Sequence, residues 1–266
     1  MKKIPVAIVT GATRGIGRSI VDKLSSEGVC CIMVGSKLES FQHMHNNPVQ
    51  LKGQMHWNRG IAIDLSEWPK WTQQTTYPGW HFSESPGRRS QPQPGSWALL
   101  DFDYTLYDLA LMVNCAGVTQ ASPSILYGTD AMQRLMNINF LSAASLCNIA
   151  SKRMARSRRY LEYAPHIINI SSVVASPTVT PVPGTSLYAG SKAALSQYSR
   201  VLSAELARAG IRVSCVSPSL VAETDMIRNL PAKAKSVLES YFGAEHRQSP
   251  DDVASQVWDL YTSASS

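Results

Sequence analysis

Several signatures of familiar protein classes are missing from this sequence. Its 5 cysteines form no C-x-x-C pair and lie in apolar segments, which predicts reduced, packed thiols and neither a disulfide framework nor a zinc site. No apolar run approaches the roughly 20 residues of a membrane-spanning helix. Charged residues make up only 17% of the chain and hydrophobic residues 44%, a balance typical of globular proteins. We therefore expect a globular chain that buries most of its apolar surface.

Acidic residues are scarce relative to basic ones, 19 against 25, and the formal net charge is +6. A basic surface can attract a polyanion or an acidic carrier of substrate. Nucleic acid is the less favoured partner, because the chain has no RNA-binding motif and no predicted strand with paired aromatic residues. The charge alone does not distinguish these partners.

Internal repeats are also missing, and residues 1–266 are expected to form a single domain. The regular pattern breaks down at about 67–108, where tryptophans are scattered among prolines. We expect a loop-rich insertion there, partly disordered around 83–96. Its tryptophans are expected to cover the surface of the main domain, and the alternative is that they line a ligand groove.

A glycine-rich turn stands near the start of the chain. The apolar run Val6–Thr10 predicts a buried strand, and an amphipathic pattern that stops near 27–28 predicts a helix after the turn. Between them, Gly11 would permit a tight turn, Gly15 would let the backbone approach a phosphate, and Gly17 would let helix and strand pack closely. A pyrophosphate would then bind at the helix N-terminus, where N–H groups and the helix dipole favour an anion. The alternative is a glycine-rich turn that binds no ligand.

An acidic side chain is missing at the end of the second predicted strand, Val29–Val34. Such a residue usually binds the ribose 2′-hydroxyl of NAD. Ser36 and Lys37 stand there instead, and Arg14 lies in the glycine turn, a set that favours a 2′-phosphate. The sequence thus predicts NADP(H) over NAD(H), and the alternative is three ordinary polar residues on the surface.

Two further predicted strands end in residues that suit a cofactor. Gly60–Ile63 is followed by Asp64, which is placed either to bind an adenine edge or simply to face solvent. Leu109–Val113 leads into Asn114 and the small residues up to Gly117, which would allow a cofactor to approach closely. Because parallel strands end at the same edge of a sheet, these segments are expected near the glycine turn.

Tyr188 and Lys192 form a pair four residues apart in a predicted helix. That spacing leaves both on one face, about 6 Å apart along the axis. The tyrosine pKa of about 10 is high for acid–base catalysis near neutrality, and a neighbouring cation favours phenolate. The strand Ile167–Ile170 ends at 171–172, where a serine hydroxyl could point at the same place. Alone, the pair is equally explained by packing and solubility.

The remaining segments supply two more candidates. Asn139 lies among apolar residues in a predicted helix over about 132–149, where a buried asparagine usually satisfies a nearby main-chain group. Thr224 lies in the loop after the predicted strand Ile211–Val216. The chain from 232 to 261 is predicted to be helical, and no further strand follows.

Taken together, these motifs resemble the short-chain dehydrogenase/reductase family. The resemblance rests on TGATRGIG at 10–17, NCAG at 114–117, Asn139, Ser172 and YAGSK at 188–192. It implies an α/β fold with one Rossmann-type, doubly wound parallel sheet and flanking helices. The family's final strand is not visible in this sequence. Because that strand often contributes a subunit contact, the choice between a dimer and a tetramer as the expected homo-oligomer stays open.

The resemblance also implies roles for four catalytic residues. Tyr188 would donate a proton to the substrate carbonyl oxygen, and Ser172 would hydrogen-bond the same oxygen. Lys192 would lower the pKa of Tyr188 and hold the nicotinamide ribose, whereas Asn139 would position a water in the proton relay. The cofactor NADPH would be bound by Gly11, Arg14, Gly15, Ile16, Gly17, Ser36, Lys37, Asp64, Asn114, Gly117, Tyr188, Lys192 and Thr224, with Asn114 and Gly117 along its length and Thr224 at its carboxamide.

Within the family, the chain is most similar to the mitochondrial 3-oxoacyl-[acyl-carrier-protein] reductases of yeast, through AIDLSEWPKW, VPGTSLYAGSKAALS and TDMIRNLP. This similarity implies NADPH-dependent reduction of a 3-oxoacyl thioester on acyl carrier protein in mitochondrial fatty-acid synthesis. Arg153, Arg156 and Arg208 would attract that acidic carrier. One alternative is reduction of another small carbonyl compound, such as a ketone, quinone or sugar. A second, a cofactor-binding scaffold without turnover, is opposed by the complete catalytic set.

Three features depart from the family pattern. The loop 173–187 is longer than usual and must bulge without displacing Ser172 or Tyr188. Ser219 replaces the glycine that usually follows the proline after the sixth strand. The residues Met1–Ile4 leave no room for an amphipathic, Arg-rich presequence. A mitochondrial location is therefore expected from the resemblance alone, and a cytoplasmic location is the alternative.

Overall fold

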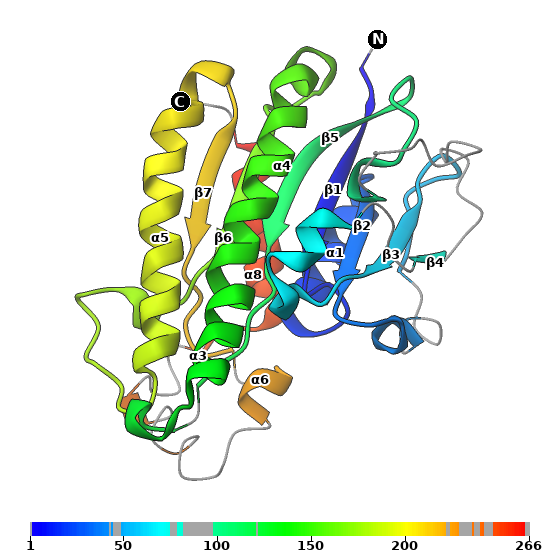
Figure 1. Ribbon diagram of the computed structural model, residues 1–266. Coiled ribbons are helices and arrows are strands. Elements are labelled where there is room, and N and C mark those ends of the chain that lie inside the picture. Colours follow the sequence, from blue (N-terminus) through cyan, green and yellow to red (C-terminus); the bar gives the residue numbers. More distant parts are fainter. Residues whose placement is uncertain are drawn as a thin grey trace.

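A seven-stranded sheet in the order β4-β3-β2-β1-β5-β6-β7 forms the centre of the computed structural model (Figure 1). The structure describes residues 2–42, 44, 49–74, 79–81, 98–120, 122–221, 224–228, 236, 240–241 and 247–263. The strands are β1 (Ile4–Thr10), β2 (Cys30–Gly35), β3 (Asn58–Ala62), β4 (Gly79–His81), β5 (Tyr107–Asn114), β6 (His166–Ile170) and β7 (Arg212–Val216). All six strands predicted from apolar runs are present, with small shifts of their ends.

One strand, β4, is an antiparallel addition to the predicted parallel sheet. β4 comes from the predicted insertion and runs antiparallel to β3, with Gly60 opposite Trp80. The other six strands pair in parallel. A parallel return usually needs a crossover helix, and the described residues between β3 and β4 form only short 3₁₀ turns. No crossover helix is present among the described residues of this connection, in keeping with the antiparallel direction of β4.

Helices cover both faces of the sheet, and α4 and α5 lie together on one of them (Figure 1). The α-helices are α1 (Gly15–Ser26), α3 (Thr129–Met136), α4 (Ser142–Ser157), α5 (Ser186–Leu206), α6 (Asp225–Arg228) and α8 (Pro250–Thr262). The 3₁₀ turns are Leu38–Phe41, Leu65–Glu67, Lys70–Gln73, Ala98–Leu100, Ser124–Leu126, Arg158–Tyr160, Val173–Ala175 and Ala207–Ala209. A π-helical turn, Asn137–Leu141, joins α3 to α4 and interrupts the continuous α-helix predicted there.

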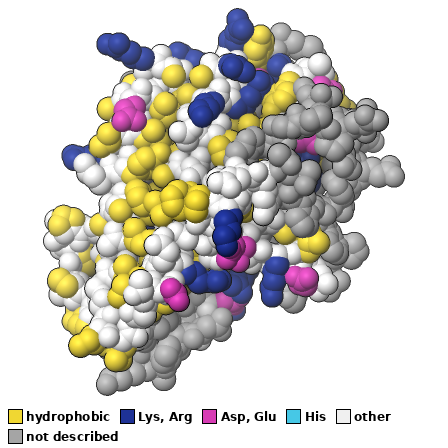
Figure 2. All heavy atoms as spheres, viewed as in Figure 1, with side chains coloured by type: hydrophobic (Ala, Val, Ile, Leu, Met, Phe, Trp, Pro, Cys, Tyr) yellow, Lys and Arg dark blue, Asp and Glu magenta, His cyan; other side chains and the backbone are white. Residues whose placement is uncertain are grey.

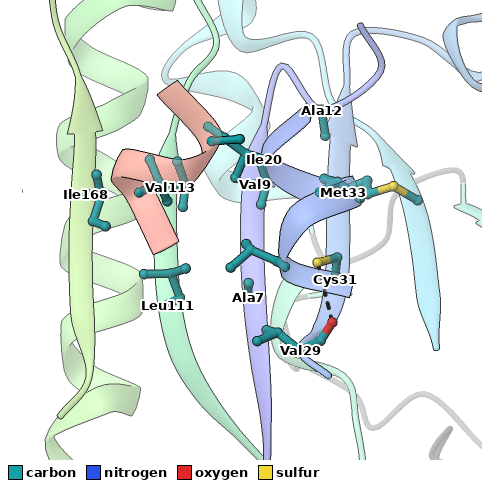
Figure 3. Close-up of a cluster of buried hydrophobic side chains, with 14 of the residues drawn as sticks. Ala7, Val9, Ala12, Ile20, Val29, Cys31, Met33, Leu111, Val113 and Ile168 are labelled. Atoms are coloured by element: carbon teal, nitrogen blue, oxygen red, sulfur yellow. Dashed lines mark hydrogen bonds between the residues drawn. The ribbon is translucent and has the colours of Figure 1, made fainter. Parts of the chain in front are cut away.

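Alternating side chains of β1 divide the core into two clusters. Ala7 and Val9 point toward α1 and α8, and Figure 3 shows this cluster. Val6 and Ile8 point to the opposite face, where they pack with residues of α4 and α5. Successive strand residues face opposite sides, so a central strand covered on both sides must be apolar throughout. This explains why the strand predictions from short apolar runs are confirmed.

The start of the insertion packs on α4. The indole N–H of Trp68 donates to Ser145 Oγ at 2.8 Å, and that of Trp71 donates to Ser142 Oγ at 3.3 Å. These two tryptophans therefore cover the surface of the main domain, as predicted. The predicted disorder at 83–96 lies outside the described residues, as do residues 232–235, 237–239 and 242–246 of the helical region predicted over 232–261.

The C-terminal part of the described chain is helical at α8, within the region predicted to be helical. No strand follows β7 in the parts of 217–263 that the structure describes, apart from an isolated bridge between Leu220 and Arg247. Among all described residues, no helix combines the length and apolar character needed to cross a membrane. The five cysteines are free thiols, as expected.

Candidate active site

The glycine turn between β1 and α1 leaves no space for a side chain at Gly11 or Gly17. Gly11 has φ 63°, and a Cβ atom there would lie 2.9 Å from the Cα atom of Ala116. A Cβ atom on Gly17 would lie 2.2 Å from the carbonyl oxygen of Gly11. Gly15 also has a positive φ, 54°. The turn therefore has the conformation and the close contacts predicted for it.

The N-terminus of α1 is open to an anion. The helix begins at Gly15, and the side chain of the preceding residue, Arg14, makes no capping hydrogen bond. The first N–H groups of a helix, here those of Gly15, Ile16 and Gly17, have no intrahelical acceptor, and the helix dipole favours negative charge beside them. This arrangement fits the pyrophosphate of a dinucleotide.

The three residues predicted to bind a 2′-phosphate differ in their surroundings. Ser36 and Lys37 are exposed just after β2, at the same edge of the sheet as the glycine turn. Their side chains make no hydrogen bond or ion pair with the part of the chain that the structure describes. Arg14 is 74% exposed, but its Nη1 atom pairs with Oδ2 of Asp225 at 3.1 Å. A bound 2′-phosphate would therefore compete with Asp225 for Arg14.

Asp64 and Asn114, at the ends of two strands, have different surroundings. Asp64 is exposed, and its Oδ1 atom accepts from the N–H and hydroxyl of Ser66, so the side chain caps a 3₁₀ turn. Asn114 is buried, and its Nδ2 atom donates to Oδ1 of Asn169 at 2.7 Å. The side chain of Asn114 therefore joins β5 to β6, and the predicted contact of this residue with the cofactor stays a prediction. A cofactor at Asn114 would therefore contact the main chain of this residue and not its amide group.

The segment after β5 packs between the glycine turn and Lys192. The hydroxyl of Thr10 accepts from the N–H groups of Cys115 and Ala116, both at 3.0 Å. A Cβ atom on Gly117 would lie 3.3 Å from Lys192 Nζ and 3.6 Å from Asn139 Oδ1. Gly117 therefore lies at the meeting point of predicted cofactor and catalytic residues. Sequence reasoning missed this role of Thr10 as an acceptor for the segment after β5. The only available signal is a hydroxyl side chain at the end of a strand, directly before the glycine turn.

Tyr188 lies in the first turn of α5 and is partly buried. Burial raises its pKa above the ordinary value, and a hydrogen bond with the Ser172 side chain opposes this shift. The hydrogen bond with Ser172 is the contribution that lowers the pKa in this structure, and the expected lowering by Lys192 stays a prediction. Across the long loop 173–187, the structure still brings Ser172 and Tyr188 together. They form the core of the candidate site.

Lys192 is held by the main chain at the end of β6. Its side chain is buried, and Nζ donates to the carbonyl oxygen of Ile170 at 2.7 Å. Burial lowers its pKa to about 8. An ammonium group has three N–H donors, so one bond to Ile170 leaves donors for hydroxyl groups such as those of a ribose.

Asn139 uses its side chain to hold a loop. It lies in the π-helical turn, where its Oδ1 atom accepts from the N–H of Val118 at 2.9 Å. Its Nδ2 atom donates to Val118 O and to Ser191 Oγ, both at 3.0 Å. Both amide hydrogens are therefore occupied by Val118 and Ser191, and the predicted role of Asn139 in the proton relay stays a prediction. Positioning a water would fall instead to its main chain, in a type of turn frequent at functional sites.

The loop after β7 lies against the glycine turn. Thr224 donates its hydroxyl to the carbonyl oxygen of Val221 at 2.9 Å, and its Cγ2 atom lies 3.3 Å from where a Gly15 Cβ atom would be. Its hydroxyl is thus occupied within its own loop, and its methyl group faces the turn. Ser219, the replacement for the family's glycine, donates its N–H to Gln248 Oε1 at 3.0 Å.

Comparisons with known proteins agree with this geometry. The family model for short chain dehydrogenase matches residues 5–76 and 102–235. A 3-oxoacyl-[acyl-carrier-protein] reductase (FabG) from Haemophilus influenzae is 28% identical over 252 residues, 95% of this chain and 88% of the relative. A (3R)-3-hydroxyacyl-CoA dehydrogenase from Mus musculus is 25% identical over 256 residues, 95% of this chain and 87% of the relative.

Solved structures show the same fold. A metagenomic short-chain oxidoreductase in complex with NADP has a TM-score of 0.66 at 22% identity, and the match covers 99% of this chain and 93% of the other. The family match spans well over half of the sequence and includes the glycine turn, Ser172, Tyr188 and Lys192. This chain therefore belongs to the short chain dehydrogenase family and is an oxidoreductase with a Rossmann-type α/β fold.

Proposed function

We propose that this protein uses NADPH to reduce a 3-oxoacyl thioester on acyl carrier protein to the 3-hydroxyacyl form. The observation that carries the proposal is the meeting of Ser172, Tyr188 and buried Lys192 beside the glycine turn. The similarity to the 3-oxoacyl-[acyl-carrier-protein] reductase from Haemophilus influenzae supports the choice of substrate.

The site residues suit proton transfer to a carbonyl oxygen. A bound NADPH would supply the hydride. The hydroxyl groups of Ser172 and Tyr188 would both hydrogen-bond the substrate oxygen, and Tyr188 would give it a proton. The raised pKa of Tyr188 keeps the phenol protonated near neutrality, as a proton donor requires. The positive charge of Lys192 would then stabilise the phenolate that remains.

NADPH is proposed over NADH because no acidic side chain follows β2. Ser36 and Lys37 are exposed there, where a 2′-phosphate would meet a cation instead of a carboxylate. Turnover with both cofactors at equal concentration tests this choice. Equal or better turnover with NADH would contradict it.

The carrier protein needs a docking surface other than the one expected. Arg153 binds the buried Asp108 near the start of β5, with Nη2 2.5 Å from Oδ1. Arg156 and Arg208 lie near the last residues of α4 and α5, and α5 alone extends about 30 Å from the turn that holds Tyr188. Figure 2 shows several Lys and Arg side chains at this upper end, where both helices finish. The three arginines lie at the end of the sheet opposite the site, and we therefore no longer propose them as the residues that bind the carrier protein.

Substrate choice is tested by following the loss of NADPH absorbance with three acceptors. Acetoacetyl-[acyl-carrier-protein], acetoacetyl-CoA and a simple ketone should be compared at matched concentrations. The proposal expects the carrier-bound thioester to give the highest kcat/KM. A second candidate, reduction of the coenzyme A thioester, is favoured by the similarity to the (3R)-3-hydroxyacyl-CoA dehydrogenase. A preference for the simple ketone would contradict both candidates.

Location and assembly follow as separate proposals. A mitochondrial location rests on the resemblance to mitochondrial reductases, and fractionation of cells that produce the protein would test it. A homo-oligomer is proposed on the same basis, and light scattering would measure its mass. A cytosolic pattern would contradict the first proposal, and a monomer would contradict the second.

A further inference from the structure

A buried glutamine reaches from the segment after β5 to the start of α5. Gln120 is 2% exposed, and its Oε1 atom accepts from the main-chain N–H of Leu187 at 2.7 Å and of Tyr188 at 3.3 Å. Its Nε2 atom donates to the carbonyl oxygen of Ser122 at 2.8 Å, which orients the amide. One side chain therefore binds two N–H groups in the first turn of the helix that holds Tyr188.

This contact replaces a cap that the helix does not supply itself. Thr185 stands at the capping position of α5, but its side chain makes no capping hydrogen bond. Its hydroxyl donates instead to the carbonyl oxygen of Val182 at 2.8 Å. The first N–H groups of a helix need an external acceptor, and capping residues normally provide one. Here the acceptor comes from Gln120, far away in the sequence.

The carbonyl group of Tyr188 is held through a second route. Ser191 donates its hydroxyl to this oxygen at 2.7 Å and accepts from Asn139 Nδ2 at 3.0 Å. Asn139 also binds both main-chain groups of Val118, two residues before Gln120. The N–H and the C=O of Tyr188 are therefore both tied to the same loop. This double attachment fixes the main chain from which the phenol projects.

We infer that Gln120 is a positioning residue for Tyr188, because it sets the first turn of α5 and thereby the distance from the phenol to Ser172. The inference rests on the proposed function, in which Tyr188 donates the proton. Proton transfer depends strongly on geometry, and a displacement of about 1 Å can reduce a rate by about 100-fold. Because a long loop precedes Tyr188, the hydrogen bonds to Gln120 are needed to fix the start of α5.

The test compares two substitutions at one position. Gln120→Met keeps the length of the side chain and removes the acceptor oxygen, whereas Gln120→Glu keeps an acceptor and places negative charge at a helix N-terminus, where it is favourable. We expect Gln120→Met to lower kcat by about tenfold or more with little change in KM for NADPH. Gln120→Glu should retain more of kcat than Gln120→Met, because it keeps the acceptor for Leu187 and Tyr188, although its carboxylate cannot donate to Ser122 O. Gln197→Met, at an exposed position of α5, serves as the matched control.

Amide hydrogen exchange gives a readout that does not depend on turnover. The N–H groups of Leu187 and Tyr188 should exchange faster in Gln120→Met, whereas those in the middle of α5 should not change. Wild-type exchange and kcat in Gln120→Met would overturn the inference, as would equal losses in the Met and Glu variants. If the wild-type protein reduced no carbonyl substrate, the proposed function would fail, and exchange would still decide whether Gln120 holds the helix.

Discussion

Buried polar groups are satisfied in different ways at the two ends of the parallel strands, the end where β5 begins and the end where the site lies. At the edge opposite the site, Asp108 is fully buried and binds cations, with Arg153 Nη2 at 2.5 Å and Lys3 Nζ at 3.5 Å. At the site edge, Lys192 and Asn139 are equally buried, but they bind main-chain carbonyl and N–H groups. The buried charge of Asp108 is balanced by ion pairs, whereas Lys192 donates to an uncharged carbonyl group and keeps further donors for a ligand.

This difference separates stability from chemistry. A buried ion pair is costly to break, because the partner that remains keeps an uncompensated charge. A lysine held by one carbonyl group keeps further donors for a ligand. We therefore expect substitutions at the Asp108 edge to change unfolding and substitutions at the Tyr188 edge to change turnover. Four predictions test this comparison.

The largest effect is expected for Tyr188→Phe. The substitution removes the proton donor and keeps the ring, so kcat should fall by about 10²- to 10⁴-fold, the usual contribution of general acid catalysis. NADPH binding, measured by fluorescence titration, and the free energy of unfolding should change little. Normal turnover by Tyr188→Phe would refute the proposed role of the phenol.

A large change in stability is expected for Asp108→Ala. The substitution leaves Arg153 and Lys3 without their buried partner, and the free energy of unfolding should fall by about 3 kcal/mol or more. Turnover of the protein that remains folded should match that of the wild type. Urea unfolding measures the loss, and the exposed Asp259→Asn is the matched control. A lower kcat in folded Asp108→Ala would show that the two edges are coupled.

A moderate, pH-dependent effect is expected from His166, at the Asp108 edge. Burial lowers its pKa to about 3, and the imidazole is therefore neutral in the folded protein. The unfolded chain binds a proton below about pH 6.5, so stability falls as pH decreases from there, by about 1.4 kcal/mol per unit. Unfolding at pH 7.5 and pH 5 should differ by about 2 kcal/mol from this residue. His166→Gln should remove that part of the difference, and an unchanged pH dependence would argue against this assignment.

The smallest effect is expected at the ion pair between Arg14 and Asp225. Asp225→Asn frees Arg14 for the 2′-phosphate, so NADPH should bind about two- to threefold more tightly, in keeping with the small energy of exposed ion pairs. NADH binding should not change. Arg14→Gln should weaken NADPH binding in the same titration. Equal shifts for NADPH and NADH would exclude Arg14 from 2′-phosphate binding.

Local sequence patterns predict the central strands and the glycine turn well. Val6–Thr10 and Ile167–Ile170 are short apolar runs, and central parallel strands must be apolar because helices cover both faces. Gly11 and Gly17 are identifiable because their backbone geometry excludes side chains. The edge strand β4 has no comparable signal, since its three residues lie where the regular apolar pattern breaks down.

The pairing of side chains is predicted less well. Asn114 and Asn139 lie in motifs of the site, yet each uses its amide to hold neighbouring segments. Arg153 has a positive charge that would attract an acidic carrier protein, but its guanidinium group is bound to the carboxylate of Asp108. In each case the partner is distant in the sequence, and residue type alone does not identify which of several partners is near.

The sequence by itself determined the family and the parallel strands and predicted Ser172, Tyr188 and Lys192 as site residues, because period, spacing and glycine positions are local properties. Only the tertiary structure decided how these residues are held. Tyr188 depends on Gln120, and Lys192 depends on Ile170, through hydrogen bonds between segments that meet only when the sheet is complete. Main-chain donors and acceptors are present at every residue, so only the folded arrangement selects which of them supports the site.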